Sequence, residues 1–188
     1  MSEFEMCVLR PQDTEMLYRH YQELDAESKG CRFGIQISDY ALAHFISNLD
    51  LSSDIHFAVV EANSILALAQ VSKYSSTTNH RLELGISVAN NARRQGFASL
   101  LWDCATAHAI SCNMHEIYVI HSPHNHAMGS FCRQKELRIG NDLGERVGIW
   151  TNPTWAEPKN IHEKIFQDWP GILPWPHPVT TEPNFLPV

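Results

Sequence analysis

The chain has 188 residues, of which 44% are hydrophobic and 19% are charged, and 14 Lys and Arg stand against 21 Asp and Glu for a formal net charge of −7. This length and composition predict one compact core with an appendage, and they exclude a largely disordered chain. Because no segment concentrates basic residues and no apolar run approaches the ~20 residues of a membrane span, we expect neither a nucleic-acid partner nor a membrane partner.

The N-terminal half predicts a strand, two helices and three further strands. Residues 5–9 form the first strand, and Pro11 opens a helix that runs to about Ser28. After a loop at residues 30–34, Ser38 caps a second helix. Three β-rich runs follow, joined by short polar segments, and they predict an antiparallel meander over residues 56–61, 64–74 and 81–88.

The second half alternates helices and strands. A helical pattern covers residues 94–112, a strand follows at 116–120, and a further helix at 125–135. A strand, a helix and a strand in this order predict a βαβ crossover. Two closing strands at residues 137–139 and 145–150 pair around a polar turn.

The last segment differs from the rest in composition. Residues 151–188 hold eight of the ten prolines and three of the five tryptophans, which is typical of an extended segment packed on a core. We therefore expect a core domain over residues 1–150 and a proline-rich C-terminal extension over residues 151–188.

The clearest functional signal is residues 81–101, RLELGISVANNARRQGFASLL. A strand ends in a short polar loop, a glycine follows two arginines, and a helix begins directly after it, which is how a chain presents backbone N–H groups to a diphosphate. Gly96 allows close approach, and Arg93 and Arg94 add positive charge. The residues alone leave open the alternative of an exposed loop before a well-formed helix. A Walker loop and a dinucleotide fingerprint are excluded, because GK[ST] and GxGxxG are absent.

This segment resembles the central motif of the GCN5-related N-acetyltransferase (GNAT) family, in which a strand-ending Val is followed, after four residues, by [RQ]xxGx[GA]. Here the pattern reads Val88, ANNA and then Arg93 to Ala98. The predicted order of elements over residues 4–150 is also similar to the family's order. The resemblance implies an α/β (α+β) fold, with a mixed, mostly antiparallel central sheet flanked by about four helices.

The resemblance also implies a ligand and a reaction. Acetyl-CoA, as acyl donor, binds where the fourth and fifth strands diverge, and a primary amine attacks the thioester without a covalent enzyme intermediate. Asn125 stands where the family's second cofactor motif has an Asn before a helix. The residues implied to bind acetyl-CoA are Ile86, Ser87, Val88, Arg93, Arg94, Gln95, Gly96, Phe97, Ala98, Ser99 and Asn125.

Glu83 is our candidate for the catalytic base, because it lies on the strand entering the implied site, five residues before Val88. A solvated surface carboxylate is the alternative. His80 is a weaker candidate. Many family members have a Tyr as general acid seven residues after the Asn, and Cys132 stands there in this chain. Cys132 is therefore a candidate acid, with a buried packing residue as the alternative.

Residues 29–34 lie, by the resemblance, in the region that shapes the acceptor site. There Arg32 and Phe33 contact an acceptor carboxylate and side chain, or they only hold the loop. The sequence does not choose among four acceptors, namely a small amine, an amino acid, an antibiotic and a protein amine. A homodimer is also left open.

Other reactive side chains carry less weight. His121, His124 and His126 are close in sequence, but no carboxylate or cysteine stands at ligand spacing beside them, so we expect no metal. The five cysteines include no close pair, which predicts neither a disulfide framework nor a zinc ribbon. The N-terminal sequence also lacks the features of a signal peptide. From this and from the cysteine pattern we expect a cytoplasmic protein.

The sequence thus predicts an acyl-CoA-dependent N-acetyltransferase. Because the family's Tyr is replaced, a non-catalytic acyl-CoA-binding sensor or regulatory module of the same fold is the alternative. A third hypothesis is an interaction protein in which the proline-rich extension binds a partner.

Overall fold

The structure, a computed structural model, describes residues 4–51, 53–74 and 80–153. The predicted C-terminal extension lies outside the described residues from position 154 onward. In chain order the elements are β1 (Glu5–Val8), η1 (Pro11–Asp13), α1 (Thr14–Glu23), α2 (Ala26–Phe33), α3 (Asp39–Ser47), β2 (Ile55–Glu61), β3 (Ser64–Lys73), β4 (Arg81–Val88), η2 (Asn90–Ala92), α4 (Phe97–Ser111), β5 (Glu116–His121), α5 (His126–Gln134), β6 (Arg138–Asp142) and β7 (Glu145–Thr151).

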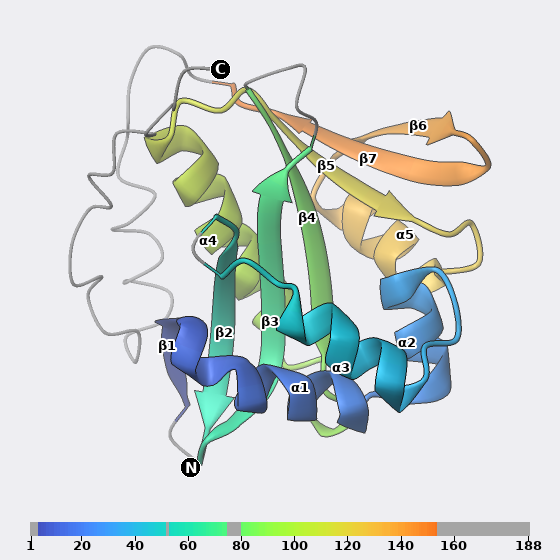
Figure 1. Cartoon of the computed structure of the whole chain (residues 1–188). Helices are drawn as coiled ribbons and strands as arrows, with labels where there is room; N and C mark the ends of the chain where they lie inside the picture. The colour runs from blue at the N-terminus through green and yellow to red at the C-terminus, as the bar shows by residue number, and fades with distance from the viewer. Residues whose placement is uncertain (1–3, 52, 75–79, 154–188) are drawn as a thin grey trace, which may run out of the picture.

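The strands form one seven-stranded sheet in the order β1-β2-β3-β4-β5-β7-β6. Neighbouring strands are antiparallel except β4 and β5, which are parallel and are connected through α4. The predicted meander, the βαβ crossover and the mixed α/β fold class are confirmed. Figure 1 shows α1 and α3 on one face of the sheet and α4 on the other.

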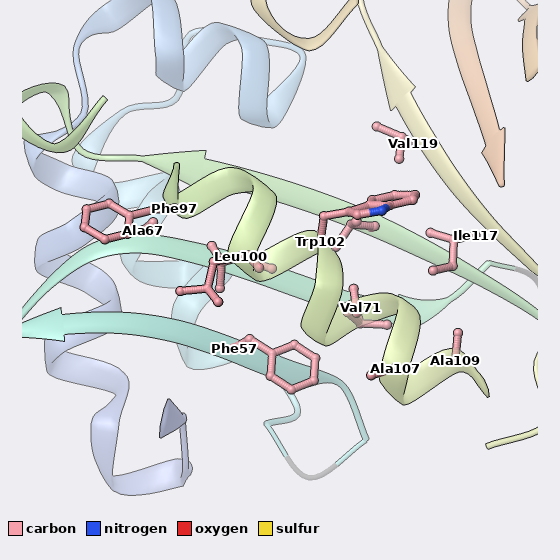
Figure 2. Close-up of a cluster of buried hydrophobic side chains, with 14 of the residues drawn as sticks. Phe57, Ala67, Val71, Phe97, Leu100, Trp102, Ala107, Ala109, Ile117 and Val119 are labelled. Carbon is pink, nitrogen blue, oxygen red and sulfur yellow. The ribbon is translucent and has the colours of Figure 1, made fainter. Parts of the chain in front are cut away.

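The helix α4 forms the centre of one core layer. Leu100 and Leu101 have no exposed surface, and Trp102 packs edge-on against the rings of Phe131 and Trp150. Figure 2 shows Leu100 and Trp102 of α4 facing residues of the strands, among them Phe57. Burial of a large aliphatic side chain contributes about 1.5–3 kcal/mol, so α4 holds the strands beneath it firmly.

The opposite face is covered by α1 and α3. Leu17, Tyr21 and Leu42 are almost completely buried there. Tyr21 and the rings of Phe33 and Phe45 meet edge to face, with centroids 5.2 to 6.3 Å apart. The aromatic cluster thereby fixes α1, α2 and α3 to one another.

The prediction of one helix from Pro11 to Ser28 is wrong. The chain forms η1 and α1, becomes extended at the buried Leu24 (φ −61°, ψ 144°), and starts α2 after Asp25. The side chain of Asp25 accepts a hydrogen bond from the Ser28 N–H at 2.7 Å, which caps the new helix. Burial of Leu24 and this cap together break the helical period.

The predicted loop at residues 30–34 is also wrong, because α2 runs through it to Phe33 and ends at Gly34, whose φ is 72°. Other boundaries shift by one to three residues. The helix predicted from residue 94 begins at Phe97, and the first closing strand covers Arg138–Asp142. Within the described residues, no helix has the length and apolar character required to span a bilayer.

A buried histidine connects α1 to the centre of the sheet. His20 is 3% exposed, and its ring nitrogens are hydrogen-bonded to the Ile65 carbonyl at 3.0 Å and the Ser87 hydroxyl at 2.8 Å. Burial lowers the pKa of His20 from 6.5 to about 4, with a smaller contribution in the same direction from the charge of Arg32. His20 is therefore neutral in the folded protein at neutral pH.

This pKa predicts acid sensitivity. Between pH 6.5 and pH 4 the unfolded chain binds a proton at His20 that the folded protein does not bind, so the free energy of unfolding falls as the pH is lowered through this range. The full effect is about 3 kcal/mol. Urea unfolding at several pH values measures it, with His20→Gln as the non-titrating comparison. An equal pH slope in both proteins would contradict the assignment.

Cys132 of α5 packs against β7. It has no exposed surface, and burial raises the pKa of its thiol to about 11. A Cβ built on Gly148 would lie 2.9 Å from Cys132 Sγ and 3.0 Å from Leu137 Cδ1. The glycine therefore makes room for the sulfur atom.

This contact predicts a measurable coupling. Gly148→Ala overpacks the site and lowers the free energy of unfolding by about 1–3 kcal/mol. In a Cys132→Ala background the same change costs less, because Sγ is gone and the added methyl group occupies its space. Urea unfolding of the four proteins gives the coupling energy. Equal costs in both backgrounds would show that the two residues do not share this space.

Candidate functional site

The parallel ladder between β4 and β5 is short. It contains three residue pairs, Arg81 with Glu116, Leu82 with Ile117 and Glu83 with Tyr118. The remaining residues of β4 stay paired with β3 as far as Val88 but have no partner in β5. Figure 1 shows the two strands meeting at one end and separating toward the other. The sheet therefore has an internal edge along the second half of β4.

The main chain of β4 is oriented toward this edge at every second residue. At Arg81 and Ala89 the main chain is hydrogen-bonded to the β3 side, at 3.0 and 2.8 Å. Because main-chain groups alternate along a strand, the intervening residues direct theirs toward the β5 side. Beyond the ladder these residues are Ile86 and Val88.

The predicted loop and helix start follow directly. Gly96 immediately precedes α4 with a φ of 88°, and Arg94 has a φ of 60°. Gly96 is the N-cap residue of α4 and has no side chain to cap the helix. The backbone N–H groups of Arg94, Gln95, Gly96 and Ala98 donate no hydrogen bond to any other described residue. The exposed segment from Arg93 to Gly96 thus leads into an open helix N-terminus, which carries partial positive charge.

The two arginines of the loop have different surroundings. The guanidinium of Arg93 donates to Asp25 Oδ2 at 2.9 Å and to Ser28 Oγ at 2.6 Å, and so links the loop to the start of α2. Hydrogen bonds from Ser28, and then the Arg93 side chain, lower the pKa of Asp25 to about 2. Arg94 is exposed, and no described residue accepts a hydrogen bond or forms an ion pair with its side chain.

Glu83 lies at the point where the strands separate. It belongs to the last β4–β5 pair, opposite Tyr118, and its side chain is half-buried. The next acidic residue on this face, Glu116, is held by Arg81 at 2.9 Å and accepts a hydrogen bond from the Tyr118 hydroxyl. Within the described part of the chain, no ion pair or hydrogen bond engages the Glu83 carboxylate.

Several other residues that were predicted to bind the ligand use their side chains for contacts within the protein. Ser87 directs its main chain toward β3 and its hydroxyl to His20. Asn125 caps α5 by accepting from the Met128 N–H at 3.0 Å. Phe97 is 4% exposed and packs edge-on against Phe4, so it anchors the start of α4 in the core, whereas Ala98 and Ser99 in the same turn are partly exposed.

The burial of Cys132 favours the packing alternative over that of a general acid, since a thiol without exposed surface and with a raised pKa is a poor proton donor to a ligand. His80 lies at the closed end of β4, where its carbonyl accepts from the His115 N–H at 3.0 Å. It is thus on the N-terminal side of the three β4–β5 pairs, away from the internal edge.

The histidine cluster is dispersed by the fold. His121 is buried at the end of β5 and hydrogen-bonded to the Ser122 carbonyl, whereas His124 and His126 are in the turn and first position of α5. Among residues that the structure describes, no group of three or more His, Cys, Asp or Glu is arranged to hold a metal ion.

The sequence reasoning missed two residues that shape this region. His20 holds Ser87 from a helix 67 positions earlier, and no local signal predicts that contact. Gln70, in the middle of the apolar strand β3, accepts a hydrogen bond from Arg32. A polar residue inside the run ILALAQV was the signal for it.

The fold is shared with several solved acetyltransferases. The GNAT domain of PAT from S. lividans superimposes with a TM-score of 0.68 at 16% identity, covering 78% of this chain and 89% of that one. Spermidine N-acetyltransferase from Vibrio cholerae, solved with CoA and spermine, gives 0.60 at 15% identity, with 78% and 93% covered. The putative acetyltransferase yncA from Salmonella typhimurium, solved with acetyl-CoA, gives 0.59 at 12% identity, with 84% and 99% covered.

A search of curated proteins found no match to this sequence. The family model described as acetyltransferase (GNAT) family matches residues 16–135, which is more than half of the chain and includes β4, the loop at residues 93–96, α4 and α5. The match thus contains both the internal edge and the open start of α4. The chain belongs to the GNAT acetyltransferase family.

Proposed function

We propose that this protein transfers the acetyl group of acetyl-CoA to a primary amine by direct attack of the amine. The observation that carries the proposal is the separation of β4 from β5 after Glu83, which leaves an internal main-chain edge that leads to the open N-terminus of α4. Neighbouring structures solved with CoA or acetyl-CoA support the choice of ligand.

The segment from Arg93 to Ser99 fits a diphosphate. An anion at a helix N-terminus gains from the helix dipole and from N–H groups that lack an internal acceptor. Gly96 lets the backbone approach the phosphates closely, because its left-handed φ is unstrained and it has no side chain. The exposed Arg94 side chain supplies positive charge. The Arg93 side chain keeps the loop attached to α2.

The internal edge fits the extended arm that links the diphosphate to the thioester. Main-chain groups of Ile86 and Val88 face the gap, as a strand faces its neighbour. An arm that contains amide groups forms hydrogen bonds with this main chain in the way a further strand would. Bound there, acetyl-CoA supplies an activated acyl group.

Glu83 takes a proton from the substrate ammonium, directly or through a water molecule, and the neutral amine then attacks the thioester. It lies where the edge begins, and among described residues no partner holds its carboxylate. General base catalysis by a positioned carboxylate accelerates such reactions by about 10²–10⁴-fold. Because Cys132 is buried, the proposal assigns protonation of the departing thiolate to water.

The burial of Cys132 also favours a second candidate, a non-catalytic acyl-CoA sensor of the same fold. A sensor needs the internal edge and the helix N-terminus but has no use for Glu83. Release of CoA thiol in the presence of primary amines, above the uncatalysed rate, separates the two.

The role of Glu83 predicts a specific kinetic defect. Glu83→Gln keeps the shape of the side chain but removes its basicity, so kcat/KM for thiol release with a panel of primary amines falls by about 10²–10³-fold. Affinity for acetyl-CoA stays unchanged. The matched control is Glu15→Gln, an exposed carboxylate on α1 paired with Arg19. Full turnover by Glu83→Gln would contradict the assignment.

A further inference from the structure

Arg32 on α2 lies against the strand that carries Glu83. A Cβ built on Gly85 would lie 3.3 Å from Arg32 Cζ and 3.5 Å from Nε and Nη2. The guanidinium thus covers the main chain of β4 at a position where any side chain would crowd it. Gly85 is two residues beyond Glu83 on the same face of the strand, about 7 Å along it.

The guanidinium is held in place from several sides. Its Nη2 donates to Gln70 Oε1, and Gln70 in turn donates to Asp54 Oδ2 at 3.0 Å. The rings of Tyr21 and Phe33 lie 5.6 and 5.5 Å from Cζ. These contacts fix the position of a charged group without neutralising it, because a glutamine and two aromatic rings carry no net charge.

No described carboxylate lies within ion-pair distance of Arg32. Its other donors reach solvent, since none of its nitrogens is a buried polar atom without a partner. The positive charge also contributes to the lowered pKa of two neighbouring buried histidines, His20 and His56, after burial itself. A partly buried guanidinium with spare donors and no counter-ion is a preformed site for an anion.

We infer that Arg32 binds a carboxylate of the acceptor, so that the substrate is an amine with a carboxylate a few bonds from its nitrogen, as in a free amino acid. The planar guanidinium matches a carboxylate in two parallel hydrogen bonds. The amine then lies on the Glu83 side, and the carboxylate lies against the guanidinium beside Gly85. The inference rests on the proposed acyl transfer and excludes the N-terminal amine of a protein, whose neighbouring carbonyl is an uncharged amide.

The test compares L-amino acids with their carboxamides, which share the amine and the side chain but lack the negative charge. CoA thiol release by the full chain measures kcat/KM for each pair. The wild-type protein prefers at least one acid over its amide by about 10- to 100-fold. Arg32→Gln abolishes this preference, because it slows transfer to the acid far more than transfer to the amide; titration of the variant with acetyl-CoA controls for its folding. Arg19→Gln, the same change on α1, keeps the preference.

A second variant protects the test against misfolding of Arg32→Gln. Gly85→Ala retains the arginine but displaces its guanidinium, so it reduces the preference for the acid. Equal rates for acids and amides in the wild-type protein, or an unchanged preference in both variants, would overturn the inference while acyl transfer stands. Thiol release with other primary amines but with neither of these two classes would overturn the inference alone. Thiol release with no primary amine at all, in a protein that binds acetyl-CoA, would overturn the proposed function and the inference with it.

Discussion

The ladder between β4 and β5 ends after three pairs, and the main chain of β4 beyond them therefore needs other hydrogen-bond partners. Hydrogen-bonding groups along the second half of β4 lie inside a sheet rather than at its outer edge, and polar main-chain groups that are neither paired nor solvated cost free energy. A ligand with amide groups meets the requirement. In the proposed function, the sheet thus sets both the place of the ligand and its extended form.

The helix α2 connects the two ends of the proposed site. Asp25 and Ser28 hold Arg93 of the loop, and Arg32, one turn after Ser28, covers Gly85 of β4. Residues four apart lie on the same helix face, so one face of α2 contacts both the loop and the strand. A short helix therefore sets the position of the diphosphate loop relative to the acceptor side.

The strand order and the βαβ crossover were predictable from the sequence because β-rich runs, polar turns and the helical pattern before β5 are local features. The loop at residues 93–96 was predictable because glycine, flanking arginines and a helix start are local features. The break at Leu24 was not, since it depends on burial of that side chain against the sheet and on the cap by Asp25. A continuous helical pattern conceals a break of this kind.

The candidate site was predicted in part for the same reason. Glu83 and the glycine loop were found from their positions along one strand and one helix. By contrast, the tie between His20 and Ser87, and the position of Arg32 over Gly85, join segments more than 50 residues apart. For Cys132 the sequence left open an acid and a packing residue, and its complete burial and its contact with Gly148 favour the second.

The most direct test is calorimetric titration of the full chain with acetyl-CoA and, separately, with acetyl-pantetheine, which lacks the diphosphate. The account predicts saturable binding of one acetyl-CoA per chain. It predicts at least about 10-fold weaker binding of acetyl-pantetheine, because the contacts at the N-terminus of α4 are missing. No detectable binding of acetyl-CoA at millimolar concentration, or equal affinity for the two ligands, would contradict the role given to the helix start and the internal edge.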